Sequence, residues 1–342
     1  MRWNIDPQSL AETILQGDRL ALARACTEVE NDTAAGEQVI STLFQKSGKA
    51  HLVGITGSPG TGKSSIVNQV AREYRLRHPD SRVAIIAVDP TSPFSGGAVL
   101  GDRVRMRDLV GDEQVFIRSM ATRGALGGLS RQTTALALLF DCAGYELVII
   151  ETVGAGQSEV DIVRLAHTTI VVEAPGLGDD IQAIKAGIME IADILVVNKA
   201  DHPGVEATER ALRSMLEMAQ GRIRINTGHH GGELGMTGKS IQTSPAVAWM
   251  PSVLRTVAIE NKGTREVVDE IARHRVWMEI NGRWSAKEHL RLRSDLVNRL
   301  KDQLFDHWLG KFTESQLEGM VEQVMARKKS PYQAASELLS KV

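Results

Sequence analysis

The stretch Gly57-Ser58-Pro59-Gly60-Thr61-Gly62-Lys63-Ser64 decides the fold of this 342-residue chain. It has the pattern G-x-x-x-x-G-K-[ST], which is typical of a phosphate-binding loop. The apolar run at residues 52–55 predicts a buried strand before it, and apolar residues at helical spacing follow it. Because a strand, a glycine-rich loop and a helix in this order suit a bound phosphate, the sequence predicts a nucleoside triphosphate site.

The residue types in this loop have distinct expected roles. Glycines allow backbone N–H groups to turn toward an anion, and the following helix presents the positive end of its dipole. We expect the Lys63 ammonium to reach the β- and γ-phosphates and the Ser64 hydroxyl to bind Mg²⁺. The residues predicted to contact the nucleotide here are Gly57, Ser58, Pro59, Gly60, Thr61, Gly62, Lys63, Ser64 and Ser65.

Composition limits the class of protein. Hydrophobic residues make up 42% of the chain, charged residues 24%, and the formal net charge is -2, as in ordinary soluble domains. This charge does not indicate a nucleic-acid partner, and no apolar run is long enough to span a membrane. Two cysteines, Cys26 and Cys142, are expected to be buried thiols of a reducing compartment. With no apolar signal core at the N-terminus, we expect a cytoplasmic protein.

Short apolar runs alternate with helical patterns between residues 49 and 280. Because these runs are apolar throughout, they predict strands covered on both faces, and hence a mostly parallel sheet flanked by helices. The fold class is therefore α/β, with the core of a P-loop NTPase. The predicted strands after the first are residues 83–88, 147–150, 169–172, 194–197 and 253–259, and helices are predicted at 206–218 and 264–274.

Helical patterns flank this core on both sides. Residues 1–48 are predicted to form an N-terminal helical extension that is interrupted at Gly17-Asp18, and residues 281–342 a C-terminal one. The C-terminal segment carries an apolar stripe that consists of Leu290, Leu292, Leu296, Leu300, Leu304 and Trp308. An apolar stripe of this width needs a buried partner, so we expect a homodimer held by the C-terminal segment, with packing of the stripe on its own domain as the alternative.

Polar residues follow the ends of several predicted strands, where ligands gather in an open parallel sheet. Glu151 is expected to hold magnesium, directly or through water, and Gly154 to present its N–H to the γ-phosphate. Asp89 and Asp102 lie near a loop rich in glycine, serine and proline, and are further candidates for the magnesium region. The sequence therefore predicts a metal set of Ser64, Asp89, Asp102 and Glu151.

The segment Asn198-Lys199-Ala200-Asp201 follows another predicted strand and has the pattern N-K-x-D. The Asp201 carboxylate can accept hydrogen bonds from N1–H and the amino group of guanine, a donor pair that adenine lacks. The Lys199 stem is expected to lie along the base, and Asn198 to hold the loop. These residues predict GTP and GDP rather than adenine nucleotides.

The residue that would orient the attacking water in some small GTPases is missing. Ala155 stands where those proteins carry glutamine, and Gln157 lies two residues further on. We therefore expect slow hydrolysis by the protein alone and faster hydrolysis with a partner. Cations that complete the site are expected among Arg103, Arg105, Arg107 and Lys185, and the catalytic candidates are Lys63, Glu151, Asp102 and Lys185.

The sequence resembles the MeaB/ArgK-like GTPases, which are associated with methylmalonyl-CoA mutase. The stretches that carry the resemblance are residues 54–64, 88–93, 96–106, 151–159, 178–188 and 198–201. It implies a homodimeric chaperone that uses GTP to assist cobalamin loading, exchange and protection of an adenosylcobalamin-dependent acyl-CoA mutase. It also assigns Ser64, Asp89, Asp102 and Glu151 to the magnesium region, and the loop around Gln182 and Lys185 to a switch that contacts the mutase.

Two points differ from the family pattern or leave the function open. The base-contacting turn of the family appears here as Val257-Ala258-Ile259, so a serine contact is lost and a backbone contact from Ala258 is expected. A metal-insertion GTPase of the nickel-enzyme maturation kind is an alternative, but it would need a Cys/His site, and His229-His230 is the candidate. A kinase acting on a transport protein would need a base that the sequence does not show.

Overall fold

The computed structural model describes residues 6–89, 106–109, 111–121, 131–152, 158–176, 191–226 and 248–340. The chain forms two compact units, Met1–Glu288 and His289–Val342. The first unit includes both the N-terminal helices and the predicted nucleotide-binding core. The domain boundaries predicted after residues 48 and 280 therefore remain predictions from sequence.

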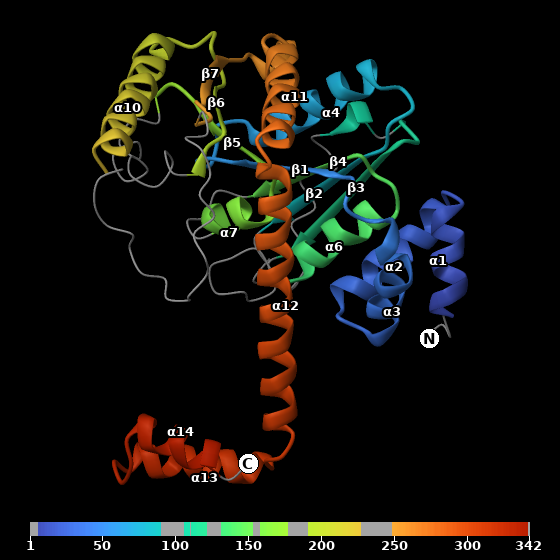
Figure 1. Cartoon of the computed structure of the whole chain (residues 1–342), viewed down its shortest axis with the longest axis vertical. Helices are drawn as coiled ribbons and strands as arrows, with labels where there is room; N and C mark the ends of the chain where they lie inside the picture. Colours follow the sequence, from blue (N-terminus) through green and yellow to red (C-terminus); the bar gives the residue numbers. More distant parts are fainter. Residues whose placement is uncertain are drawn as a thin grey trace. The chain divides into compact units, whose positions relative to one another are not determined.

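A seven-stranded sheet organises the first unit, in the order β3-β2-β4-β1-β5-β6-β7 (Figure 1). Its strands are β1 (His51–Thr56), β2 (Val83–Asp89), β3 (Val115–Ala121), β4 (Leu147–Thr152), β5 (Thr168–Glu173), β6 (Ile194–Val197) and β7 (Ser252–Arg255). Each neighbouring pair is parallel, which confirms the predicted fold class. Because β1 lies between β4 and β5, the phosphate-binding loop opens from the middle of the sheet.

Helices cover both faces of the sheet, as the uninterrupted apolar strands predict. Figure 1 shows α4 (Lys63–Arg77) and α11 (Thr264–Ile280) on one face, and α6 (Arg131–Cys142) and α7 (Ser158–Leu165) on the other. Alternate residues of one strand point to opposite layers. Ile149 of β4 packs in the core beneath α4 and α11, whereas Val148 and Ile150 pack against the α6 side. A further helix, α10 (Val205–Asn226), packs on β6 and β7.

The N-terminal extension consists of α1 (Pro7–Leu15), α2 (Arg19–Glu30) and α3 (Ala34–Leu43). The predicted break at Gly17-Asp18 is confirmed, because Asp18 caps α2 by accepting a hydrogen bond from the Ala21 N–H at 2.8 Å. The helices share one hydrophobic core with α6. Cys26 and Cys142 are buried in that core as predicted, and burial raises the pKa of the Cys26 thiol to about 12.

Two elements differ from the sequence prediction. The edge strand β3 was not predicted, because Arg118 interrupts its apolar run; in the structure the Arg118 Nε donates to Glu30 Oε1 of α2 at 2.6 Å. Residues 253–259 are not one strand. The strand β7 ends at Arg255, and Ala258–Glu260 forms a 3₁₀ turn, because the Val257 N–H bonds back to the Lys262 carbonyl at 3.0 Å.

The C-terminal segment is helical, as predicted. The helix α12 (Arg283–Leu309) begins in the first unit and continues in the second, where α13 (Glu314–Met325) and α14 (Pro331–Ser340) follow it. The leucines of the predicted apolar stripe on α12 are exposed, with Leu290 at 63% and Leu304 at 67% of full accessibility, while Trp308 at its end is half-buried. Of the helices within the described residues, none has the length and apolar character needed to cross a membrane.

A buried polar network lies at the amino ends of β1 and β5, on the edge of the sheet opposite the phosphate-binding loop. His51 Nε2 lies 2.7 Å from Thr168 Oγ1, which lies 2.8 Å from His274 Nδ1. His274 Nε2 in turn lies 3.4 Å from Asp193 Oδ1. Burial lowers the pKa of His274 to about 4, and that of His51 well below its ordinary value. Both imidazoles are therefore neutral at pH 7.

A second branch of this network attaches the start of α12 to the sheet. The Leu52 N–H donates to His167 Nδ1 at 3.0 Å, and His167 Nε2 lies 2.5 Å from Glu288 Oε1. The Lys287 ammonium donates to the His167 carbonyl at 3.0 Å, and the Trp284 ring stacks on the His167 ring with centroids 4.0 Å apart. The first turns of α12 are therefore held by specific contacts.

We expect the first unit to lose stability as the pH falls from about 6.5 toward 4. The folded pKa of His274 is about 4 against 6.5 in the unfolded chain, so the unfolded state takes up the proton first. Between pH 7.5 and 5.0 this one histidine should remove about 2 kcal/mol from the free energy of unfolding, measured by urea titration. His274→Gln should show a smaller loss over the same interval. The exposed His202→Asn is the control, and equal losses in all three proteins would contradict the prediction.

Candidate nucleotide site

Two glycines of the phosphate-binding loop adopt conformations that other residues rarely take. Gly57 has φ +138°, and a Cβ there would lie 2.0 Å from the Val172 carbonyl oxygen of β5. Gly62 has φ +91°, and a Cβ there would lie 2.3 Å from Asn198 Nδ2. The loop can therefore pass this close to its neighbours only with glycine at both positions. The helix α4 begins at the next residue, so its N-terminus faces the loop.

Lys63 lies inside this loop. Its side chain is buried, and the ammonium donates hydrogen bonds to the Gly57 carbonyl at 2.8 Å and the Ser58 carbonyl at 3.0 Å. Both acceptors belong to the loop that would surround the phosphates. The ammonium therefore lies inside the loop, and its contact with the β- and γ-phosphates stays a prediction.

Ser64 and Glu151 come from separate segments of the chain and meet in the structure. The Ser64 hydroxyl donates to Glu151 Oε1 at 2.6 Å, and both side chains are buried. Glu151 reaches this position because it pairs with Ile55 in the register of β4 against β1, one residue before the strand ends. A hydroxyl and a carboxylate are the hard oxygen donors that Mg²⁺ prefers, so this pair fits a magnesium site.

Asn198 joins the phosphate-binding loop to the segment that follows β7. Its Nδ2 donates to the Thr61 carbonyl at 2.8 Å, and its Oδ1 accepts from Thr256 Oγ1 and from the Ala258 N–H, both at 3.1 Å. The side chain is buried. The loop-holding role predicted for Asn198 from sequence therefore agrees with its contacts.

Lys199 and Asp201 remain accessible beside this junction. Lys199 has φ +57°, and the Ala200 N–H donates to the Thr256 carbonyl at 3.0 Å. The Asp201 side chain is 44% exposed and lies 3.8 Å from His202 Nε2. The carboxylate can thus meet a ligand from solvent, as selection of guanine requires.

Three residues after β7 show what sequence reasoning found and what it missed. Ala258 is buried and its N–H donates to Asn198, while Ile259 is 81% exposed and Val257 is buried. The contact predicted from the Ala258 backbone to the base stays a prediction. The contact of Thr256 with Asn198 was not predicted from sequence, although a polar residue directly after an apolar strand is a signal that could have indicated it. The sequence also did not indicate that the Lys262 charge lies near Asp201. A hydrogen bond to Glu260 raises the pKa of Lys262, and the charge of Asp201 acts in the same direction.

Several predicted site residues lie outside the described part of the chain. They are Asp102, Gly154 and Lys185, together with Ala155, Gln157, Gln182, the arginines 103 and 105, and His229-His230. For Asp89 the structure gives the backbone at the end of β2. Within the described ranges, no group of three or more His, Cys, Asp or Glu side chains is placed to hold a metal ion.

Removing the Asn198 amide should weaken both the fold and the nucleotide site. In Asn198→Ala, the buried partners at Thr61, Thr256 and Ala258 lose their hydrogen bonds, so we expect a loss of at least about 1–3 kcal/mol in the free energy of unfolding. GTP affinity, measured by fluorescent nucleotide titration, should fall at least about tenfold by the same loss. Thr256→Val should show a smaller effect, and the exposed Asn298→Ala none. Unchanged affinity in Asn198→Ala would contradict this.

Comparisons with known proteins agree with this geometry. Residues 22–313 match the family model described as "Methylmalonyl Co-A mutase-associated GTPase MeaB". The chain is 40% identical to a putative GTPase of Pyrococcus abyssi, over 97% of this chain and 96% of that protein. It is 30% identical to the mitochondrial methylmalonic aciduria type A homolog of Caenorhabditis elegans, over 87% of this chain and 73% of that protein.

A solved structure has the same overall fold. It is described as a LAO/AO transport system kinase, and it superposes with a TM-score of 0.67 at 25% sequence identity. The match covers 99% of this chain and 98% of that one. The likeness therefore extends over the sheet and both helical extensions.

Proposed function

This chain belongs to the family of methylmalonyl-CoA mutase-associated GTPases, MeaB, and we propose that it assists an adenosylcobalamin-dependent acyl-CoA mutase. It binds GTP and hydrolyses it to GDP and phosphate, as its relatives are named GTPases. In the proposal, the nucleotide state controls cobalamin loading, exchange and protection of the mutase. The observation that supports a GTP-dependent switch is the buried Ser64–Glu151 pair beside Lys63.

The residues at this pair have separate tasks in the proposed reaction. Ser64 and Glu151 would hold Mg²⁺, with Asp89 and Asp102 as further proposed ligands; bound there, the metal would offset charge on the β- and γ-phosphates. Lys63 already bonds two loop carbonyls and can transfer those hydrogen bonds to phosphate oxygens. Asp201 selects guanine, since its carboxylate is exposed beside the loop that Asn198 fixes.

Glu151 is well placed to pass the nucleotide state to the rest of the chain. It is buried next to the end of β4, and the sequence runs from there directly to Gly154. A γ-phosphate contact at Gly154 would be present with GTP and absent with GDP, which is the difference that a nucleotide switch needs. We propose that the mutase responds to this difference and that its binding accelerates hydrolysis of GTP.

The mutase proposal can be tested by single-turnover hydrolysis of GTP with and without the acyl-CoA mutase of the same host. We expect slow hydrolysis alone and acceleration by the mutase, since a cation moved to the developing charge can be worth ~10³–10⁵ in rate. Lys185→Ala should keep nucleotide affinity and basal rate and lose the acceleration. Lys63→Ala should lose hydrolysis in both conditions.

Two outcomes would contradict this assignment at different levels. If the mutase neither co-elutes with the GTP-loaded protein nor changes its rate, the partner is wrong while the GTPase activity stands. If Lys185→Ala is accelerated as much as the parent protein, the partner is right and the proposed cation is wrong.

We also propose that the protein is a homodimer held by α12. The described part of this helix exposes Leu296 at 58% and Leu300 at 48%, in line with Leu304. Single exposed apolar residues are ordinary, but a row of them along one helix indicates a covered face. The small core that α13 and α14 form around Met320 and Ala334 leaves this row outside it.

A charge placed in this row should weaken the dimer. Burying the carboxylate of Leu300→Glu is unfavourable, so we expect the dimer dissociation constant to rise at least about tenfold. The measurement is light scattering during gel filtration over a dilution series. Asn298→Asp, on the opposite face of the same helix, is the matched control and should leave the dimer intact. A parent protein that is monomeric, or a Leu300→Glu dimer as tight as the control, would refute the interface.

A further inference from the structure

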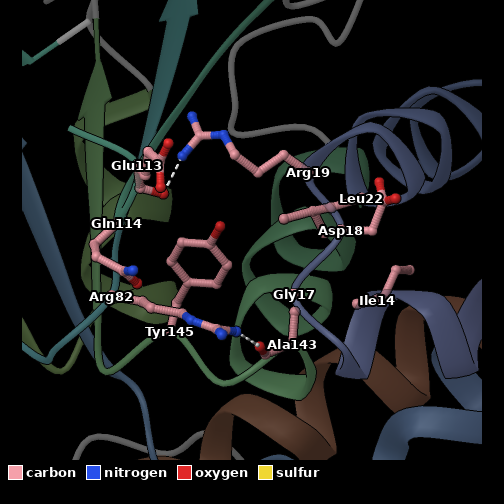
Figure 2. Close-up of a pocket in the computed structure, with 10 residues that line it drawn as sticks. All are labelled: Ile14, Gly17, Asp18, Arg19, Leu22, Arg82, Glu113, Gln114, Ala143 and Tyr145. Carbon is pink, nitrogen blue, oxygen red and sulfur yellow. Dashed lines mark hydrogen bonds between the residues drawn. The ribbon is translucent and has the colours of Figure 1, made fainter. Parts of the chain in front are cut away.

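A polar pocket lies at the amino ends of the strands, whereas the nucleotide site lies at their carboxyl ends. It has a volume of about 110 Å³ and lies between the α1–α2 turn and the amino ends of β2 and β3 (Figure 2). One water needs roughly 10–15 Å³ of such space, so the pocket holds several waters or one small ion. Because the strands are parallel and the phosphate-binding loop follows the carboxyl end of β1, the two sites lie at opposite edges of the sheet.

The hydroxyl of Tyr145 faces this pocket. The residue is 5% exposed, its ring packs edge-on against Phe140 with centroids 5.4 Å apart, and Figure 2 shows the hydroxyl on the side of Arg19. Among the described residues, the hydroxyl makes no hydrogen bond. Burial raises the pKa of Tyr145 to about 12, and the charges of Arg19 and Arg82 act against this rise. The hydroxyl therefore stays protonated and can donate.

Two guanidinium groups flank the hydroxyl, and backbone carbonyls hold them. Arg19 donates from Nη1 to the Glu113 carbonyl (Figure 2). It also donates from Nη2 to the Val115 carbonyl at 2.8 Å. Arg82 donates from Nη1 to the Ala143 carbonyl at 3.3 Å. In the described part of the chain, neither guanidinium pairs with a carboxylate within salt-bridge distance. Each guanidinium carries five N–H donors, so both keep donors beyond these bonds.

The α1–α2 turn is shaped to admit Arg82. Gly17 has φ +88°, and a Cβ there would lie 3.2 Å from Arg82 Nη2, so glycine permits this close approach. Two carboxylates also line the pocket. Asp18 is engaged in capping α2 through the Ala21 N–H, and the Glu113 residue is exposed to solvent. Within the described residues, the groups that face the pocket without a carboxylate partner are therefore donors: the buried Tyr145, the half-buried Arg82 and the exposed Arg19.

We propose that this pocket binds a small anion, a carboxylate or phosphate group, between Tyr145, Arg19 and Arg82. Charge-assisted hydrogen bonds from guanidinium groups suit the oxygens of both chemical groups. The anion would accept a hydrogen bond from the Tyr145 hydroxyl and join the turn between α1 and α2 to the sheet. This site is separate from the nucleotide site and does not depend on the mutase proposal.

The test titrates inorganic phosphate and, in a second arm, succinate into the full chain saturated with a non-hydrolysable GTP analogue and Mg²⁺. Because the analogue also fills the γ-phosphate position, the anion is prevented from binding at the nucleotide site. Calorimetry should show saturable binding in at least one arm, and the tighter arm identifies the preferred chemical group. Tyr145→Phe and Arg82→Gln should each weaken this binding at least about tenfold, because a hydrogen bond to a charged group is lost.

If Tyr145 had only a structural role, Tyr145→Phe would lose stability. The anion proposal predicts a different result. Tyr145→Phe without the anion should be about as stable as the parent protein, because the hydroxyl that it removes makes no hydrogen bond within the described residues. Its GTP hydrolysis should be unchanged. The exposed Tyr332→Phe is the matched control and should bind the anion like the parent. No saturable binding in either arm, or equal affinity in Tyr145→Phe and the parent, would overturn the proposal.

Discussion

The pairing of β1 with β4 on one side and β5 on the other is the constraint on which the nucleotide site depends. This register sets Ile55 beside Glu151 and Gly54 beside Thr169, so the carboxyl ends of three strands reach the same edge. The phosphate-binding loop then passes so close to the Val172 carbonyl that a Cβ at Gly57 would overlap it. A slip of one residue would point Glu151 to the other face of the sheet.

The same strands connect this edge to a different chemistry at their amino ends. His51 begins β1 and bonds to Thr168, which begins β5. Burial keeps His51 and His274 neutral by lowering the pKa of each imidazole. His167 in the same network contacts Glu288 at the start of α12. One strand thus carries the phosphate-binding loop at one end and a pH-sensitive contact at the other.

Buried polar groups at the nucleotide edge are hydrogen-bonded with little redundancy. Asn198 uses both ends of its amide, and one side chain therefore joins the phosphate-binding loop to the segment after β7. Lys63 likewise bonds to two carbonyls of the phosphate-binding loop, and Ser64 bonds to the Glu151 carboxylate. The phosphates and the metal are proposed to bind beside these groups. Such groups cost free energy when left without partners, so a bound ligand has to replace every hydrogen bond that it displaces.

The sequence by itself determined the parallel sheet, the phosphate-binding loop and the guanine motif, because each depends on local spacing. Apolar runs predicted the buried strands, and N-K-x-D placed Asn198 after one of them. Only the tertiary structure decided which distant residues meet. The edge strand β3 was not predicted because Arg118, which interrupts its apolar run, finds its partner on α2. The turn after Arg255 is held by the bonds from Val257 to Lys262 and from Ala258 to Asn198. The pocket around Tyr145 likewise requires four segments that share no sequence pattern.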